Sequence, residues 1–433
     1  MRLKNRIIEL LKLDLTTILT SLSWLLPYYL LGGFLDRRLF GIYGVTYVFQ
    51  FLWSLFNELS VKGILIYAFN DLKDDINKRN SAVFSGFLFY TFIILLCFIF
   101  SLANLNNLLD FYNISNELKE ICYIYYVYDV IAIGLQCLDF MCITYYEYTD
   151  RVYLSNKLSI IYTSIRLGSI ILCILFHTNT SIKFLILTIP LFLYTIFNYI
   201  FYIKDIYNKH IKLSFEFLKG FKYIYVGILE ELVAVFSQLL GTKNMTASTS
   251  NSADTMIFQY SISTTAIDMH WDCISNISKI SSIDLSKDNS KYENLSQLND
   301  TKVKNTIKLN LQSGFIVWII ASSLMILTFY VLSHFIAISE FMVTTLIINI
   351  IAMFFSTIGR SISSVINILN GYKILLFITL AARITKLSVA NLKSQYSLSL
   401  ALIASVMVHC IANIMLYFYY THKYKYSRKD DGL

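Results

Sequence analysis

Long apolar runs recur along the whole chain and are separated by short polar loops. A helix needs about 20 apolar residues to cross a hydrocarbon core of about 30 Å, and twelve runs are long enough. They lie at 16–35, 40–67, 81–103, 120–145, 158–177, 183–203, 223–242, 254–277, 311–333, 340–368, 373–391 and 396–420. The pattern therefore predicts an all-α integral membrane protein with about twelve transmembrane helices.

The composition of the chain agrees with this pattern. Of its 433 residues, 56% are hydrophobic and only 15% are charged, whereas a soluble domain carries about 25% charged residues. Tyr residues cluster at the ends of several runs, as at 123–126 and 419–420, where aromatic side chains favour the headgroup level. These features exclude a soluble globular protein.

Lys and Arg are distributed unequally between the loops. With the amino terminus placed inside the cell, the inside segments contain 26 Lys and Arg residues and the outside loops contain 6. Positively charged short loops stay in the cytoplasm, so we expect both termini to be cytoplasmic. The net charge of +8 then reflects topology rather than nucleic-acid binding. We predict a multi-pass protein of the cell membrane, and the abundance of Ile, Asn, Lys and Tyr indicates a bacterial source.

The longest loops divide the chain. A charged inside loop at about 204–222 follows the sixth run, and another at about 279–310 follows the eighth. The predicted parts are an N-terminal six-helix lobe (1–205), a cytoplasmic amphipathic linker (206–222), a C-terminal six-helix lobe (223–421) and a cytoplasmic tail (422–433). A charged loop follows the second span of each half, at 71–75 and 284–288. This recurrence indicates an internal duplication of the kind common in transporters.

Acidic side chains inside the apolar runs point to function, because each is costly there unless it faces protein, water or a partner. Asp268 and Asp272 lie one turn apart in the eighth run and share a helix face. Such carboxylates could bind a coupling ion, H⁺ or Na⁺, or contact the substrate. The acidic candidates are Asp268, Asp272, Asp139, Glu230, Glu231 and Asp129. The alternatives are that some lie near the cytoplasmic ends of their spans, in water, and that others hold helices together.

Cationic side chains also enter the runs, at Arg166, Arg360 and Arg383. They could neutralise carboxylates such as Asp139 or Asp272, or bind an anionic substrate, because a guanidinium contacts phosphate in a bidentate fashion. Two function classes follow. A cavity dominated by carboxylates favours a cation-coupled exporter of neutral or cationic compounds. One dominated by arginines favours a lipid-linked, phosphate-bearing substrate.

Motifs for other chemistry are absent from the sequence. It contains no P-loop motif, no nucleophile-elbow motif and no zinc-protease motif, and its 7 Cys residues lack metal-ligand spacing. We therefore expect no enzyme activity, and no cofactor or metal other than H⁺ or Na⁺ as a coupling ion. The expected partners are membrane lipid and a small-molecule or lipid-linked substrate, without nucleic acid, and we expect a monomer.

Several stretches resemble one transporter family. Residues 257–267 are similar to the eighth helix of its members, Ser286–Asn289 stands where the family has a short charged turn, and 305–310 leads into the ninth span. Together with the twelve-span layout, they resemble the multidrug and toxic compound extrusion (MATE) family, whose superfamily also contains polysaccharide flippases. The resemblance implies two pseudo-symmetric six-helix lobes and ion-coupled export of small organic molecules by alternating access. The alternative is a flippase for a lipid-linked oligosaccharide or another polysaccharide precursor.

The chain also departs from the family. The Pro-x-Gly and Val-Gly-Gln-x-x-Gly-Ala patterns that accompany the second and eighth helices of drug-extruding members are replaced by Asn57–Gly63 and Ser275–Lys279. Pro27 is kept in the first helix, but without an acidic partner nearby. The resemblance therefore indicates a divergent member and leaves the coupling ion and the substrate open.

Overall fold

The structure is a computed structural model that describes most of the chain after residue 60. The described ranges, apart from single positions within them, are 61–111, 116–176, 179–207, 211–248, 295–334 and 337–430, together with ten scattered positions between 256 and 285. Within these ranges the chain is helical, with no strand. The predicted spans at 16–35 and 254–277, and nearly all of 40–67, lie outside the described residues.

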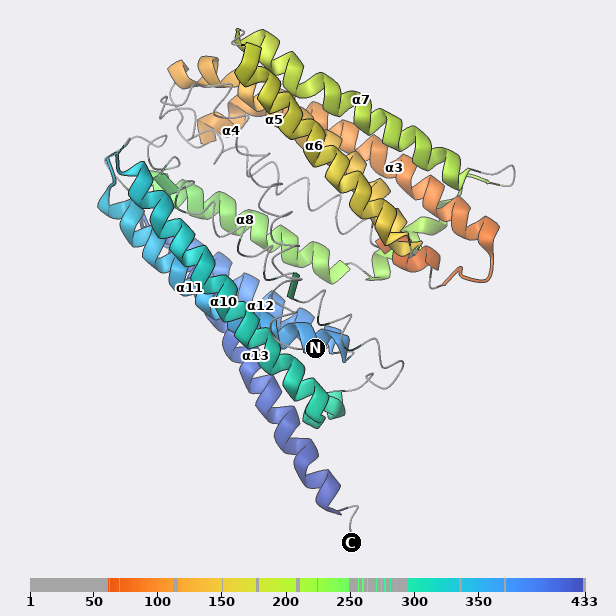
Figure 1. Ribbon diagram of the computed structural model, residues 1–433, viewed down its shortest axis with the longest axis vertical. Coiled ribbons are helices and arrows are strands. Elements are labelled where there is room, and N and C mark those ends of the chain that lie inside the picture. Colours follow the sequence, from red (N-terminus) through yellow and green to blue (C-terminus); the bar gives the residue numbers. More distant parts are fainter. Residues whose placement is uncertain are drawn as a thin grey trace. The chain divides into compact units, whose positions relative to one another are not determined.

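The described helices follow one another along the chain (Figure 1). In the first part they are α3 (Ile76–Ala103), α4 (Leu105–Phe111), α5 (Asn116–Tyr148), α6 (Val152–Phe176), α7 (Thr180–Ile206), the 3-10 helix η1 (Phe215–Tyr223) and α8 (Tyr225–Ala247). In the second they are the 3-10 helix η2 (Leu295–Asn299), α10 (Thr301–Leu332), α11 (Glu340–Ile368), α12 (Tyr372–Ala390) and α13 (Ser397–Asp430). Nine of the twelve predicted spans therefore coincide with a helix.

Six described helices are long and apolar enough to cross a membrane by length and composition: α3, α6, α7, α10, α11 and α13. The helices α5, α8 and α12 carry more polar and charged residues. These three helices hold Asp139, Glu230 and Arg383 among the predicted site residues.

Polar caps set where several helices begin. The side chain of Asp75 accepts a hydrogen bond from the backbone N–H of Lys78 at the start of α3, and Ser339 caps α11 in the same way. Such caps satisfy one of the backbone N–H groups that have no partner within the helix. The cap explains why α3 begins at Ile76 rather than at 81, where its apolar run begins.

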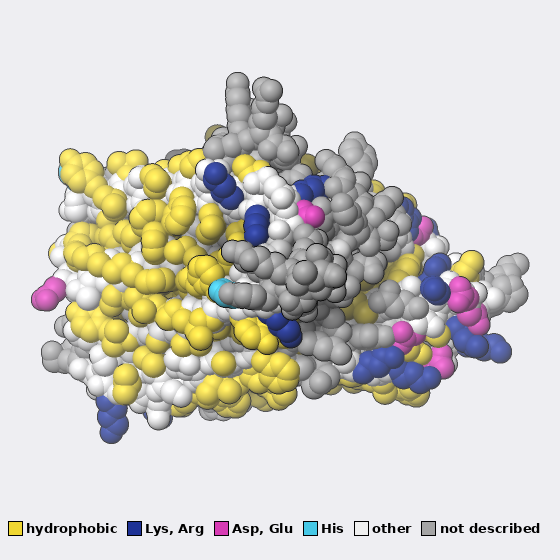
Figure 2. Space-filling view, turned by 90° about the horizontal axis from the view of Figure 1, so that it is seen from below, with side chains coloured by type: hydrophobic (Ala, Val, Ile, Leu, Met, Phe, Trp, Pro, Cys, Tyr) yellow, Lys and Arg dark blue, Asp and Glu magenta, His cyan; other side chains and the backbone are white. Residues whose placement is uncertain are grey.

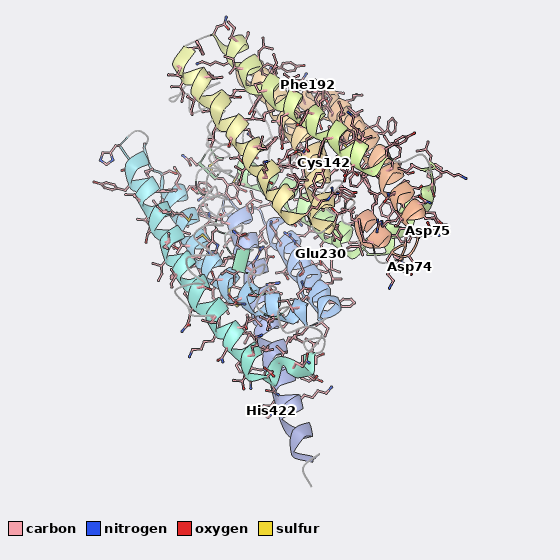
Figure 3. All side chains as sticks on the ribbon, turned by 45° about the vertical axis from the view of Figure 1, so that its right-hand side comes forward. Asp74, Asp75, Cys142, Phe192, Glu230 and His422 are labelled. Carbon is pink, nitrogen blue, oxygen red and sulfur yellow. The ribbon has the colours of Figure 1, made fainter. Side chains whose placement is uncertain are left out.

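The first helix group packs around α5 and α7. α5 lies against α3, α6 and α7, and Leu135, Tyr162, Leu191 and Tyr194 form a buried cluster there. The outer surface is apolar: Phe192 on α7, labelled in Figure 3, is 51% exposed. Figure 2 shows hydrophobic side chains spread widely over one face of the molecule, as expected of a surface in contact with lipid.

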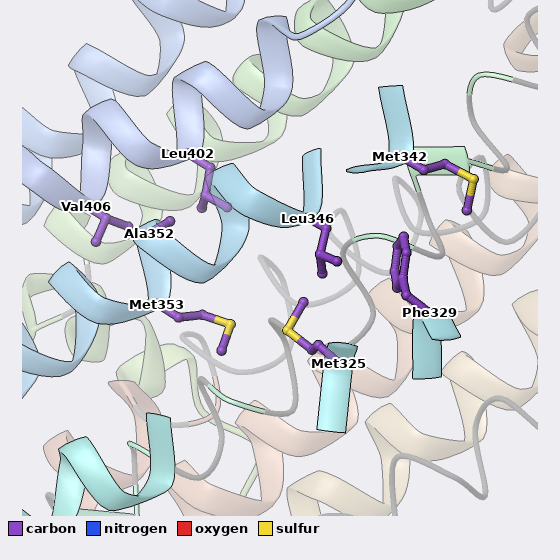
Figure 4. Close-up of a cluster of buried hydrophobic side chains, with 8 residues drawn as sticks. All are labelled: Met325, Phe329, Met342, Leu346, Ala352, Met353, Leu402 and Val406. Carbon is purple, nitrogen blue, oxygen red and sulfur yellow. The ribbon is translucent and has the colours of Figure 1, made fainter. Parts of the chain in front are cut away.

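The second helix group is built on α13, which packs against α11 and α12, while α10 packs against α11. One of its core clusters consists of Met325, Phe329, Met342, Leu346, Ala352, Met353, Leu402 and Val406 (Figure 4). Gly359 allows close packing of α11 on α13. A Cβ atom at this position would lie 3.0 Å from Nδ1 of His409 and 3.1 Å from Cα of Cys410. Small residues permit such close approach between membrane helices.

Each helix group forms a compact unit. α8 contributes Tyr225–Val235 to the first unit and Phe236–Ala247 to the second. The lobe boundaries given by the sequence remain a prediction.

Candidate functional site

A buried carboxylate lies inside the first helix group. Asp139 on α5 is 3% exposed and accepts a hydrogen bond from the side-chain amide of Asn198 on α7, which is also buried. α5 and α7 run in the same direction, and both residues lie roughly 12–14 Å from the same ends of their helices at 1.5 Å per residue. Matching depth on neighbouring helices is what brings the two side chains together.

A buried cation belongs to the same helix group. Arg166 on α6 is 2% exposed, and its guanidinium carbon lies 6.0 Å from the ring centre of Tyr162. Tyr162 interacts electrostatically with both Arg166 and Asp139. The structure therefore places Asp139 and Arg166 in one buried polar cluster around Tyr162, and the role of Arg166 in offsetting the charge of a carboxylate remains a prediction.

Uncharged oxygens complete this cluster. Thr195 lies one turn before Asn198 on α7 and so shares its helix face. The Thr195 hydroxyl and the carbonyl oxygen of the Asn198 amide are buried and have no hydrogen-bond partner within the described chain. Because buried polar atoms are normally hydrogen-bonded, these oxygens are available to a bound proton, water or hard cation.

A second polar cluster in the other helix group is cationic. The guanidinium groups of Arg360 on α11 and Arg383 on α12 both act electrostatically on the ring of His409 on α13. Lys386 lies about one turn beyond Arg383 and is also buried. Within α10–α13 the only acidic residues of the sequence are Glu340 and Asp430, at the two ends of this helix group. Two of the three predicted arginines are thus brought together, and Arg166 lies in the other group.

Asn310 is a buried polar residue of this second helix group whose side chain is hydrogen-bonded and has a packing role. Asn310 on α10 accepts a hydrogen bond from the Ser281 hydroxyl and donates to the backbone oxygen of Ser361 and to the hydroxyl of Ser364 on α11. Interhelical hydrogen bonds of this kind hold membrane helices together. They need no ligand to explain them.

Comparison with known proteins gives the fold. No protein-family model matches the sequence, and no curated protein matches it either. Solved structures do match over nearly the whole chain. One is described as the inward-facing conformation of a multidrug resistance MATE family transporter of the MOP superfamily, with a TM-score of 0.66, 11% identity, and coverage of 98% of this chain and 99% of the other.

Two further structures give the same result. An outward-facing multidrug resistance MATE family transporter has a TM-score of 0.62 at 11% identity and covers 97% of this chain and 96% of its own. A MATE protein in complex with MaD3S has a TM-score of 0.64 at 12% identity, and the match covers 99% of this chain and 98% of the other. The chain has the MATE transporter fold. The predicted fold class is therefore confirmed, and the protein is a multi-pass membrane protein.

Of the remaining predicted acidic residues, Glu230 is the one whose side chain the structure describes. Glu230 lies on α8 (Figure 3) and is partly buried. The neighbouring Glu231 on α8 and Asp129 on α5 lie in described helices, but the description does not extend to their side chains. Asp268 and Asp272 lie outside the described residues, so their predicted role remains a prediction.

Sequence reasoning missed three members of the Asp139 cluster: Asn198, Thr195 and Tyr162. Asn198 was visible as an amide inside an otherwise apolar run. The hydroxyls of Thr195 and Tyr162 carried no comparable signal, because such residues are common in membrane helices. Only the packing of α5, α6 and α7 within the MATE fold identifies them as neighbours of a carboxylate.

Proposed function

We propose that the protein is a secondary transporter that exports small organic molecules by alternating access and is driven by an ion gradient. The observation that carries the proposal is the buried Asp139–Asn198 contact beside Arg166, in a chain with the MATE fold. Structures with this fold are described in both inward-facing and outward-facing conformations. We place the protein in the plasma membrane as a monomer with both termini in the cytoplasm.

Coupling through Asp139 follows from the cost of burying charge. A carboxylate inside the bilayer must be offset by a cation or neutralised. Binding of a cation to Asp139 in one conformation more strongly than in the other shifts the equilibrium between them, by a factor of ten for about 1.4 kcal/mol of differential affinity. Asn198 links this change to α7, because its amide donates to the same carboxylate.

The proton suits this cluster better than sodium does. The unpaired oxygens of Thr195 and Asn198 would provide ligands for Na⁺. However, the permanently charged guanidinium of Arg166 belongs to the same cluster and would repel a second cation. A proton removes the carboxylate charge without needing a separate coordination space. We therefore propose H⁺ as the coupling ion.

Transport into proteoliposomes tests the proposal. Ethidium serves as the probe, and its movement is followed under an imposed pH gradient, under an imposed Na⁺ gradient, and by counterflow without any gradient. We expect the pH gradient to drive transport and Asp139→Asn to abolish that effect while counterflow persists. The control is Asp74→Asn, an exposed carboxylate in the loop before α3. Transport by Asp139→Asn that still follows the pH gradient would overturn the role of Asp139.

A second candidate function is a flippase for a lipid-linked, phosphate-bearing precursor. One feature favours it, the grouping of Arg360 and Arg383 around His409 in helices whose only acidic residues lie at the ends. Solved structures of the same fold are described as multidrug transporters, which gives export the stronger support. Accumulation of a lipid-linked precursor in a deletion strain would favour the flippase over export.

A further inference from the structure

The segment between α7 and α8 exposes large apolar side chains. We call its residues 211–223 the bridge; it includes η1 (Phe215–Tyr223). Leu213 is 76% exposed and Phe215 is 78% exposed. Leu218 and Phe221 of the same segment are exposed as well. A row of apolar side chains on a connecting segment needs a partner, because water is a poor surrounding for it.

The first part of the bridge is fixed to α3 through its backbone. The N–H of Lys212 donates to the Ser81 hydroxyl at 3.1 Å, and the N–H of Ser214 donates to the Ser85 hydroxyl at 3.0 Å. Residues 211–214 have no helical structure of their own. Backbone groups without partners are costly at membrane depth, so the two serines allow an irregular segment to lie there.

The contacts with α3 also give the depth of the bridge. The next contact along α3, after Ser81 and Ser85, is made by Phe89: the centre of its ring lies 5.3 Å from the centre of the Phe217 ring. From Ser81 to Phe89 the bridge descends α3 by roughly 12 Å at 1.5 Å per residue. The apolar run of α3 begins at about residue 81. Residues 212–215 of the bridge, which lie next to Ser81 and Ser85, are therefore at the boundary between headgroups and acyl chains.

The second part of the bridge is also fixed, by contacts with residues that precede α3. Gly220 packs against the backbone at Gly63, where an added Cβ atom would lie only 2.5 Å from the Gly63 oxygen. Lys222 forms a salt bridge with Asp71 in the loop before α3. All of these contacts are with residues that precede α4, so the outward face of the bridge is held in one orientation.

The exposed charges of the bridge are mainly positive. Lys212, Lys219 and Lys222 are exposed, and Glu216 is its only acidic residue. Lys219 pairs with Glu216 at 3.3 Å. Apolar side chains beside lysines at the inner boundary of a membrane are the pattern of a segment that lies in the interface and attracts anionic lipid.

We propose that the outward face of the bridge docks onto anionic phospholipid headgroups of the cytoplasmic leaflet. Leu213 and Phe215 insert among the acyl chains next to the headgroups, and Lys212 and Lys219 contact the lipid phosphates. The depth along α3 and the excess of positive charge favour lipid over a protein partner. The inference is independent of the transported substrate and of the coupling ion.

Depth is tested with nitroxide labels on the full chain in lipid nanodiscs. A label at Leu213→Cys is compared with one at Asp74→Cys, and unsubstituted protein is labelled in parallel to subtract the signal of native cysteines. Asp74 is exposed and lies outside the bridge (Figure 3). We expect the Leu213 label to collide more with oxygen than with a water-soluble nickel chelate, and the Asp74 label to do the opposite. Equal access of nickel to both labels would overturn the proposal.

Lipid selectivity is tested with spin-labelled phosphatidylglycerol and phosphatidylcholine. The double variant Lys212→Gln and Lys219→Gln should lower the preference for phosphatidylglycerol by about fivefold per lysine removed, the factor that corresponds to one surface charge near an anionic membrane. The matched control is Lys304→Gln with Lys308→Gln, two exposed lysines of α10, which should leave the preference nearly unchanged. A preference that survives the bridge variant, or falls equally in the control, would contradict the proposal.

Discussion

The side-chain amide of Asn198 on α7 donates a hydrogen bond to the carboxylate of Asp139 on α5, and both side chains are almost fully buried. This contact joins two helices that run in the same direction and sets their relative height. It also places the carboxylate beside α6, which carries Arg166. Stability and proposed coupling therefore depend on the same few atoms.

The contact can be measured as a coupling free energy. Asn198→Ala, Asp139→Ala and the double variant form a cycle, and thermal unfolding in detergent gives the stability of each. We expect a coupling of about 0.5–2 kcal/mol, the range for hydrogen bonds between membrane helices. Additive effects of the two substitutions would show that the contact contributes nothing to stability.

Charge balance in the cluster leads to a second prediction. Arg166→Leu should destabilise the protein by about 3–5 kcal/mol, because it removes the cation beside a buried carboxylate. Adding Asp139→Asn to Arg166→Leu should restore most of this loss, since no uncompensated charge remains. The measurement is the unfolding temperature together with the yield of folded protein. If the double variant is no more stable than Arg166→Leu alone, the two residues do not offset each other.

The close approach of α11 and α13 gives a third prediction. Gly359→Ala should cost about 1–3 kcal/mol, because the new methyl group meets His409 and the Cys410 backbone. The control is Gly168→Ala on α6, where nothing lies within 4 Å of an added Cβ atom. That substitution should be neutral or raise stability by up to about 1 kcal/mol through helix propensity. Equal effects at both positions would contradict the packing described here.

The cap of α3 predicts a dependence on pH. The backbone N–H of Lys78 lowers the pKa of Asp75 below its ordinary value. A carboxylate with a lowered pKa stabilises the folded state above its ordinary pKa of about 3.9, and the contribution is lost as the pH falls through the lower folded value. Protection from hydrogen exchange at the first turn of α3, measured relative to the intrinsic exchange rate at each pH, should therefore fall in acid.

Two variants at Asp75 separate the cap from its charge. Asp75→Asn should retain the capping hydrogen bond and remove the pH dependence of this protection, whereas Asp75→Ala should give low protection at every pH. Protection in the original protein that stays constant between pH 6 and pH 3 would rule out a contribution from the Asp75 charge; these pH limits are roughly those that bracket an ordinary Asp.

Hydropathy alone predicted where most helices lie. The runs at 81–103, 183–203 and 340–368 each coincide with a helix, because a span must be apolar over most of its length. The residue at which a helix starts was harder to predict from hydropathy. In α3 the first turn is polar, and a cap rather than contact with lipid stabilises it. The sequence marked Asp139 and Arg166 for the same reason that it marked the spans: a charge stands out in an apolar run.

Proximity between helices could not be predicted in this way. Nothing in the runs indicates that Arg360, Arg383 and His409 come together from α11, α12 and α13. Their meeting depends on how each helix is rotated and how far it slides along its neighbour. Hydropathy contains neither quantity.

The charge of Arg166 has a further consequence for the proposed coupling. A guanidinium keeps its charge at any physiological pH, so a proton that binds Asp139 adds one positive charge to this polar cluster. If the surroundings of the cluster alternate between the two sides of the membrane, that charge crosses part of the electric field. Each elementary charge moved through 100 mV corresponds to about 2.3 kcal/mol. Membrane voltage would then drive the transport cycle together with the pH difference.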